Sequence, residues 1–251
     1  MSKKTILLIV SVICLGVLVA SSTYLIKDYL QKRKLDDLRE DYSNSQTESS
    51  ENEKTEVQVP VDFEKLKAAN SDIYAWITIP GAKVDYPIVQ SEDDNAFYLN
   101  HTIDGTKSVY GSIFTENYNN KDFNDFNTLV YGHNMKNGSM FGSLKKFRDA
   151  QFFEENKYIT VYMPGRVLNY EIFAACTWDN KHILANRNFD ELENRKTYLD
   201  EIFAVRDINS IVKSDIEVTE NDRIITLSTC MNNKEKRFIV SGKLIYDSAE
   251  D

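Results

Sequence analysis

The sequence lacks the patterns that metal sites and nucleic-acid sites require. Its three cysteines, Cys14, Cys176 and Cys230, form no CxxC pair, and its three histidines are far apart in the chain. No spacing matches a set of zinc ligands, so we expect no bound metal and no other cofactor. Acidic side chains outnumber basic ones by 39 to 30, and no run of Lys or Arg is long enough to follow a phosphate backbone. We therefore expect no nucleic-acid partner.

Internal repeats are also absent, and 251 residues are few for two full domains. With 42% hydrophobic and 12% aromatic residues, the chain can bury one sizeable core. We therefore expect a single globular domain.

One long apolar run is present, at the N-terminus. Residues 6–26 carry no charge, and as a helix of roughly 20 residues they span the hydrocarbon core of a bilayer. The preceding Lys3 and Lys4 fit either a retained anchor or a secretory signal peptide. Because the run is longer than a usual signal-peptide core and Val19-Ala20-Ser21 is a poor cleavage site, we predict a transmembrane anchor over residues 1–26. Residues 6–26 are then its contact with membrane lipid.

The charges beside this run leave its orientation open. The basic residues that follow it outnumber the two lysines before it, and they are Lys27, Lys32, Arg33 and Lys34. We place the folded domain outside the cell because of the chemistry inferred below. The chain is then a single-pass protein of the cell membrane.

Residues 27–60 are expected to connect the anchor to the folded domain. Leucines alternate with charges up to Tyr42, which indicates a helical stalk. Residues 43–60 are rich in Ser, Glu, Asn, Gln and Thr, the composition of a flexible tether. We expect the folded domain to cover residues 61–251.

The folded domain shows mainly strand patterns. A short helix with Asp62 as its N-cap and with Phe63, Leu66 and Ala69 on its apolar face is expected first. The expected strands are 73–79, 84–89, 111–114, 128–131, 159–163, 168–178, 216–218, 223–229 and 237–246, with turns at Pro80-Gly81 and Pro164-Gly165. Helices are expected over 139–156 and 189–204. Many short strands with few helices indicate a mostly β fold, a closed or nearly closed barrel.

Two of the predicted strands end in groups that can react. The run from Ile224 ends at the Cys230 thiol beside a polar segment, where a thiol is more accessible than in a core. A second apolar run ends in the same way at the His133 imidazole. Arg237 opens the strand after Cys230, so a hairpin returns its guanidinium near the sulfur.

These features, in their order and spacing, resemble the sortase family over essentially all of residues 61–246. Thr226-Leu227-Ser228-Thr229-Cys230, followed by Arg237, resembles the catalytic signature of the family, and Tyr131-Gly132-His133-Asn134-Met135 resembles its histidine motif. The form of the histidine motif, the first helix and the helical insert at 189–204 are most similar to class B. The resemblance implies a closed β-barrel of about eight strands with an N-terminal helix and a helical insert, preceded by a transmembrane helix.

The resemblance also implies a cysteine transpeptidase that anchors surface proteins to the cell wall. Such an enzyme cleaves a C-terminal sorting motif through a thioester and transfers the protein to an amine of peptidoglycan or to a pilin lysine. Cys230 is then the nucleophile, His133 the acid or base, and Arg237 the cation that stabilises the oxyanion. A thioester stays reactive enough for an amine to collect, an imidazolium can protonate the leaving amine, and a guanidinium donates several hydrogen bonds.

Further residues are expected to contact the peptide. Ser228 alternates with Cys230 on the same strand face. Leu99, Asn100 and Tyr131 are implied by the resemblance to the family. The helix at 189–204 forms either a wall of the groove or a lid over the barrel.

Other interpretations are compatible with the sequence. Cys176 and Cys230 can form a disulfide, because cysteines outside the cell often pair. The chain can also be a secreted cysteine peptidase that hydrolyses, or a membrane-anchored binding module without catalysis. His101 and His182 are expected on the surface or in loops, and Arg223, at the far end of the Cys230 strand, is the nearest alternative to Arg237. The sequence leaves open the sorting motif, the acceptor amine, wall anchoring against pilus assembly, the oligomeric state and the resting protonation of Cys230 and His133.

Overall fold

The computed structural model describes residues 2–43, 59–230 and 235–250. Contacts along the chain divide it into two units, Met1–Asn44 and Ser45–Asp251. Most of the predicted tether falls on residues 44–58, which lie outside the described residues. The predicted segment boundaries at residues 26 and 60 therefore stay predictions.

The first unit is built on one helix, α1 (Lys3–Ser43). Its segment Lys3–Thr23 is long and apolar enough to cross a membrane, judged by length and composition alone. The predicted stalk continues this helix without a break, so the helical prediction for residues 27–42 is confirmed.

The second unit begins with a short helix, α2 (Phe63–Ala69). Asp62 caps it as predicted, because its side chain accepts a hydrogen bond from the backbone N–H of Lys65 at 2.9 Å. Phe63 and Leu66 are buried, whereas Ala69, the third residue of the predicted apolar face, is exposed. Two side chains therefore attach this helix to the fold.

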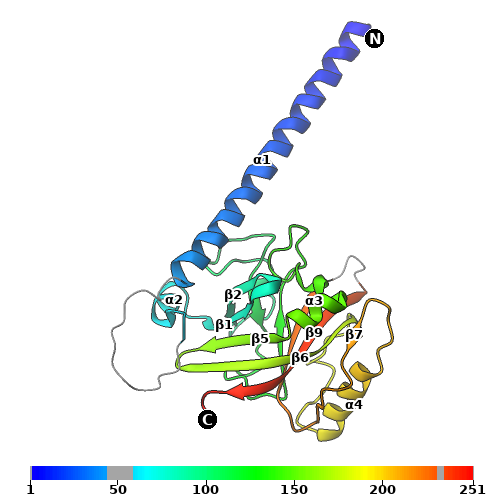
Figure 1. Ribbon diagram of the computed structural model, residues 1–251. Coiled ribbons are helices and arrows are strands. Elements are labelled where there is room, and N and C mark those ends of the chain that lie inside the picture. The colour runs from blue at the N-terminus through cyan, green and yellow to red at the C-terminus, as the bar shows by residue number, and fades with distance from the viewer. Residues whose placement is uncertain (1, 44–58, 231–234, 251) are drawn as a thin grey trace. The chain divides into compact units, whose positions relative to one another are not determined.

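Nine strands follow among the described residues, and eight of them close into a barrel (Figure 1). They are β1 (Ile73–Ile79), β2 (Val84–Val89), β3 (Ile113–Thr115), β4 (Asn127–Tyr131), β5 (Tyr158–Met163), β6 (Arg166–Asp179), β7 (Ile211–Val212), β8 (Ile224–Cys230) and β9 (Lys236–Asp247). Hydrogen bonds join them in the order β5-β1-β2-β3-β4-β8-β9-β6, and β5 also pairs with β6, which closes the ring. β7 pairs with β6 outside the ring. The predicted mostly β, eight-stranded closed barrel is confirmed.

Two turns form where the sequence predicts them. Pro80-Gly81 lies in a 3₁₀ turn, η1 (Pro80–Ala82), and the next residue, Lys83, takes a left-handed φ of 53°. Pro164-Gly165 joins β5 to β6 as a two-residue hairpin, in which Gly165 has a φ of +68°. Glycine adopts this φ without the steric cost that a side chain brings.

Where β4, β8 and β9 lie next to one another, both of their faces are buried. Val130, Leu227 and Val240 lie side by side on β4, β8 and β9 and fill the inside of the barrel. Leu129 and Ile239, one residue away, face outward and are buried in a cluster with a helix, α4 (Leu192–Phe203). This helix contributes Tyr198, Leu199 and Ile202 to the cluster. The predicted helical insert therefore covers the outer face of the sheet.

The helix predicted over 139–156 is wrong in its first part. The chain there forms a 3₁₀ helix, η3 (Leu144–Arg148), and then α3 (Ala150–Glu155). Asp149 between them is extended, with φ −87° and ψ 126°, and its side chain accepts the Phe152 N–H at 2.8 Å. One capping carboxylate thus divides a single apolar pattern into two elements.

The strand predicted at 216–218 is also wrong, because the strand lies earlier, at β7. Ile216 and Val218 are partly buried against the α4 cluster through their side chains alone. Ile211 and Val212, which make up β7, carry the same apolar signal and do pair with β6. The alternation of apolar residues at 216–218 therefore reflects burial of their side chains and not the pairing of a strand.

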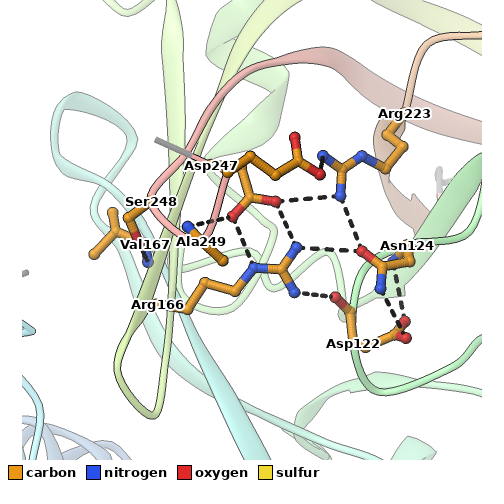
Figure 2. A network of polar contacts seen from close by, with 9 residues as sticks. Asp122, Asn124, Arg166, Val167, Arg223, Asp247, Ser248 and Ala249 are labelled. Carbon is orange, nitrogen blue, oxygen red and sulfur yellow. Dashed lines mark hydrogen bonds and ion pairs between the residues drawn. The ribbon is translucent and has the colours of Figure 1, made fainter.

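A network of ion pairs joins three parts of the barrel near the end of β9 (Figure 2). Asp247 accepts hydrogen bonds from Arg166 Nε at 2.8 Å and Nη2 at 2.5 Å, and it lies 3.2 Å from Arg223 Nη1. Asn124 Oδ1 accepts from both guanidiniums. These hydrogen bonds and the two positive charges lower the pKa of Asp247 to about 2. The start of β6, the entry to β8 and the end of β9 are held together here.

Candidate active site

The parallel pair β4–β8 brings the two predicted reactive strand ends together. Tyr131 pairs with Ser228, and Gly132 N donates to Ser228 O at 3.2 Å. His133 follows Tyr131 by two residues, as Cys230 follows Ser228. Because parallel neighbours end at the same edge of a sheet, continuing this register past the end of β4 places position 133 level with position 230. The structure describes Cys230 through its backbone only.

The antiparallel pair β8–β9 adds the predicted cation. Arg237 pairs directly with Cys230, and on its other side it pairs with Trp178 of β6. Residues 231–234, which connect the two strands, lie outside the described residues. The hairpin return predicted for Arg237 therefore agrees with the strand register.

A groove of about 170 Å³ lies over these strand ends. Its described lining is Asn95, Ala96, Leu99, Phe114, Glu116, Leu129, Tyr131, Gly132, His133, Trp178, Asp179, Asn180, Lys181, His182, Ile183, Ser228 and Arg237. Of the four residues expected to contact a peptide, Ser228, Leu99 and Tyr131 are in this lining. Asn100 is not in it; it is exposed at the end of a 3₁₀ turn, η2 (Phe97–Leu99). The walls come from the η2 side and from the loop before α4, and not from α4 itself.

His133 is held in the groove by a backbone carbonyl. Its Nε2 lies 2.6 Å from Leu99 O, and the side chain is partly buried. A carbonyl oxygen only accepts, so Nε2 carries a hydrogen whether the ring is neutral or charged. The proton that the ring can gain or lose is therefore the one on Nδ1.

Tyr131 forms part of the groove floor and keeps its proton. Burial raises the pKa of its hydroxyl strongly and the nearby Glu116 carboxylate raises it further, whereas Arg237 opposes the shift. Its ring stacks on Phe114, with centroids 5.4 Å apart. Tyr131 is therefore a neutral hydroxyl with an acidic group and a basic group close by.

Glu116 and His182 were not predicted from the sequence to be groove residues. Glu116 follows β3, and His182 lies in the loop after β6, where it was expected to be a surface or loop residue. Their side chains meet in the groove, with Glu116 Oε2 2.6 Å from His182 Nε2. Both residues stand in short polar loop segments, and no spacing rule relates two such segments of a barrel.

The other residues weighed against the site lie elsewhere. Cys176 is free and buried in the α4 cluster, which contradicts the disulfide alternative. Burial, with a smaller effect of Asp207, raises the pKa of its thiol to about 12. His101 stacks on Phe97 at 4.2 Å and is outside the described lining. Arg223 belongs to the Asp247 network.

Residues 77–245 match the family model of the sortase domain. The chain belongs to the sortase family. It is 37% identical over 189 residues to sortase B of Listeria monocytogenes, an alignment that covers 73% of this chain and 74% of that protein. Sortases are cysteine transpeptidases that act on proteins bearing a sorting signal, and the relatives support class B.

Solved structures of sortase B share the fold. The crystal structure of the Bacillus anthracis enzyme in complex with AAEK1 has a TM-score of 0.72 and 32% identity, over 88% of this chain and 99% of that one. The Staphylococcus aureus sortase B–substrate complex has a TM-score of 0.71 and 27% identity, over 88% of this chain and 98% of that one. The barrel described above is therefore the sortase barrel.

Proposed function

We propose that this sortase uses Cys230 as nucleophile, His133 as acid and base, and Arg237 as the oxyanion-stabilising cation. One observation supports the proposal above all: the registers of β4, β8 and β9 bring these three positions to the same edge of the barrel. The groove at that edge is lined by His133 and Arg237 and is open to a peptide.

In the first half of the reaction, the Cys230 thiolate attacks a peptide carbonyl, usually that of a threonine. The new C–S bond leaves an oxyanion, to which Arg237 donates hydrogen bonds. His133 transfers its Nδ1 proton to the departing amine as the C–N bond breaks, since Nε2 is engaged with Leu99 O. A thioester on Cys230 and a neutral imidazole remain.

In the second half, an amine of peptidoglycan or of a pilin subunit attacks the thioester. His133 Nδ1 takes the proton that this amine loses, and Cys230 leaves as a thiolate. The new amide attaches the surface protein to its acceptor. The enzyme returns to its starting protonation state, so no external base is consumed.

The groove is the proposed binding site of the sorting-signal peptide. Leu99 and Tyr131 offer apolar contact, and Ser228 offers a hydroxyl beside position 230. We assign Asn100 an indirect part, because its carbonyl accepts the Ser108 N–H at 2.8 Å and so shapes the loop that carries Leu99.

We further propose that residues 1–26 anchor the enzyme in the membrane with the domain at residues 61–251 outside the cell. The apolar segment Lys3–Thr23 supports an anchor by its length and composition. The sorting-signal substrate and the acceptor amine of the wall or of a pilin both lie outside the cell, which favours this orientation.

Trapping the acyl-enzyme tests the mechanism directly. The full-length chain in detergent is incubated with candidate sorting peptides and weighed by mass spectrometry. We expect one peptide-acyl adduct, located on Cys230 and released by hydroxylamine. Cys230→Ala must form no adduct, whereas Cys176→Ala, which alters a buried thiol, must form it normally. An adduct in Cys230→Ala contradicts the proposal.

Adding excess amine separates transfer from hydrolysis. A transpeptidase yields an amide product that rises with amine concentration, because the amine intercepts the thioester. Hydrolysis that is indifferent to the amine identifies a peptidase instead. A Cys230→Ala strain with intact surface display identifies a binding module.

A further inference from the structure

Glu116 and His182 reach each other from opposite sides of the groove. Glu116 follows β3, and His182 lies in the loop after β6. Between β3 and β6 the sheet contains β4, β8 and β9. A contact of 2.6 Å between these side chains therefore requires the loop to cross the outer face of three strands. Ser228 and Arg237, from two of those strands, also line the groove.

The His182 ring is oriented by its own loop. Its Nδ1 accepts the Ala185 N–H at 3.0 Å, so that nitrogen carries no hydrogen. The hydrogen of the neutral ring is then on Nε2, the atom that faces Glu116 Oε2. The Asn186 side chain donates to His182 O at 2.7 Å and fixes the same turn. Among the described residues Glu116 Oε2 accepts no hydrogen bond, so its contact with His182 Nε2 is one of proximity and charge.

The contact is shielded from water on several sides. The Glu116 side chain is 16% exposed and that of His182 is 32% exposed. Tyr118 covers the imidazole edge-on, with ring centroids 5.2 Å apart, and Tyr131 lies 6.3 Å from it. A contact between a carboxylate and an imidazole in such a place is stronger than the same contact on the open surface.

The backbone of Glu116 lies some way along the sheet from the reactive strand ends. Thr115 pairs with Val130, so Glu116 is level with Leu129, four residues before His133. At strand rise this corresponds to about 13 Å. A peptide whose scissile bond is at position 230 reaches this region only with residues remote from that bond.

We propose that the Glu116–His182 pair, here called the clasp, is a positioning element that holds residues 180–183 over the groove and thereby fixes the remote part of the peptide. The clasp does not touch the reacting atoms. It therefore contributes to binding of substrate and transition state alike, and its loss raises KM more than it lowers kcat. The kinetic part of this inference rests on the proposed function.

Kinetics of peptide cleavage by the full-length chain in detergent provide the first test. We expect Glu116→Ala and His182→Ala to raise KM about tenfold while kcat changes by less than about threefold. Glu116→Gln and His182→Gln each keep a polar side chain that can contact its partner, so each should hold KM closer to wild type than the corresponding Ala variant does. Glu92→Ala, which removes a carboxylate from an exposed ion pair with Lys121, is the matched control and should leave KM unchanged.

Hydrogen exchange tests the clasp without any activity. In Glu116→Ala, we expect peptides that cover residues 180–187 to exchange about tenfold faster, because His182 and its Ala185 contact lose their anchor. The same peptides should exchange normally in Glu92→Ala. Thermal melts check that every variant is folded.

The outcomes separate this inference from the proposed function. Unchanged exchange together with unchanged KM in Glu116→Ala overturns the clasp. A lower kcat with an unchanged KM also overturns it, because Glu116 then acts in the chemical step. A wild-type chain that cleaves no peptide contradicts the proposed function, and the exchange experiment still decides whether the clasp exists.

Discussion

Burial makes the thiol of Cys176 unreactive. It lies within β6, is fully buried under α4, and its pKa is raised to about 12 by burial. At neutral pH it is a protonated thiol and cannot compete as a nucleophile. The last residue of β8, Cys230, has a different position, at a strand end beside the groove.

Alkylation distinguishes the two thiols. In the folded chain carrying Cys14→Ala, iodoacetamide at about pH 8 should modify Cys230 alone, because only a thiolate reacts. Unfolding in urea should expose Cys176 to the same reagent. Peptide mapping by mass spectrometry reads both sites, and rapid labelling of Cys176 in the folded chain contradicts the prediction.

Arg237 should contribute through both its charge and its shape. Arg237→Ala removes the oxyanion donor, so we expect kcat/KM for acylation to fall by about 100- to 1,000-fold. Arg237→Lys keeps the charge without the forked donors and should recover only part of this loss. If Arg237→Ala is as active as wild type and unfolds at the same temperature, Arg237 does not stabilise the oxyanion.

Some of the proposed site residues can be predicted from the sequence and others cannot, for a physical reason. Cys230, His133 and Arg237 stand at the ends of strongly apolar strands, and the pairing of those strands brings the positions together. Glu116 and His182 stand in loop segments whose paths depend on what packs beneath them. Local pattern carries no information about such a contact.

At the scale of elements, the Asp247 network holds the entry to β6 and β8 against the end of β9. The Asp247 side chain is 2% exposed between Arg166 and Arg223. Its pKa is lowered from 3.8 to about 2, so the folded state gains from ionising it. This contribution is complete above about pH 4 and is lost as the pH falls toward about 2.

Urea unfolding at several pH values tests this network. The ionised Asp247 should contribute about 2 kcal/mol at pH 7, and this part should disappear as the pH falls from about 4 toward about 2. Asp247→Asn removes the carboxylate partner of Arg166 and leaves Arg223 with Glu250 as its one carboxylate partner among the described residues, and it should lower the free energy of unfolding by about 2 to 4 kcal/mol at pH 7. The variant should also lose less stability than wild type on acidification. Parallel pH curves for the two proteins contradict the assignment.

Strands were easier to predict than helices in this chain. β1, β4 and β8 bury both faces, because the barrel lies on one side and helices or loops lie on the other, so most of their residues are apolar. The region 139–156 has a helical spacing of apolar residues, but Asp149 ends one turn and starts the next. A cap of this kind changes backbone direction without changing the apolar pattern.

At the scale of the whole molecule, the chain consists of an apolar helix and a barrel enzyme in two units. The sequence predicts both parts, since a span of this length and a run of strands are each read from composition and periodicity. It does not fix the orientation, because basic residues stand on both sides of the span.

Fractionation and reporter fusions test the anchor and its orientation. We expect the full-length chain to stay in the membrane pellet after carbonate extraction. A chain without residues 1–26 should be found in the supernatant, because it has lost the apolar span. A reporter that is active only in the cytoplasm, fused after residue 251, should be silent. A strong signal from that fusion reverses the proposed orientation.

In the proposed mechanism, the parallel pairing of β4 with β8 also determines when the enzyme becomes active. Leu129 lies beside Thr226, 97 positions later in the chain, and β9 must then return along β8 to deliver Arg237. Contacts between residues so distant in sequence form late in folding. A long segment of chain must first be ordered, at a cost in entropy, before these contacts can stabilise the structure. A newly made chain therefore carries His133 without Cys230 beside it while the next 97 residues are added, and the proposed catalytic groups come together in one step with the last strands.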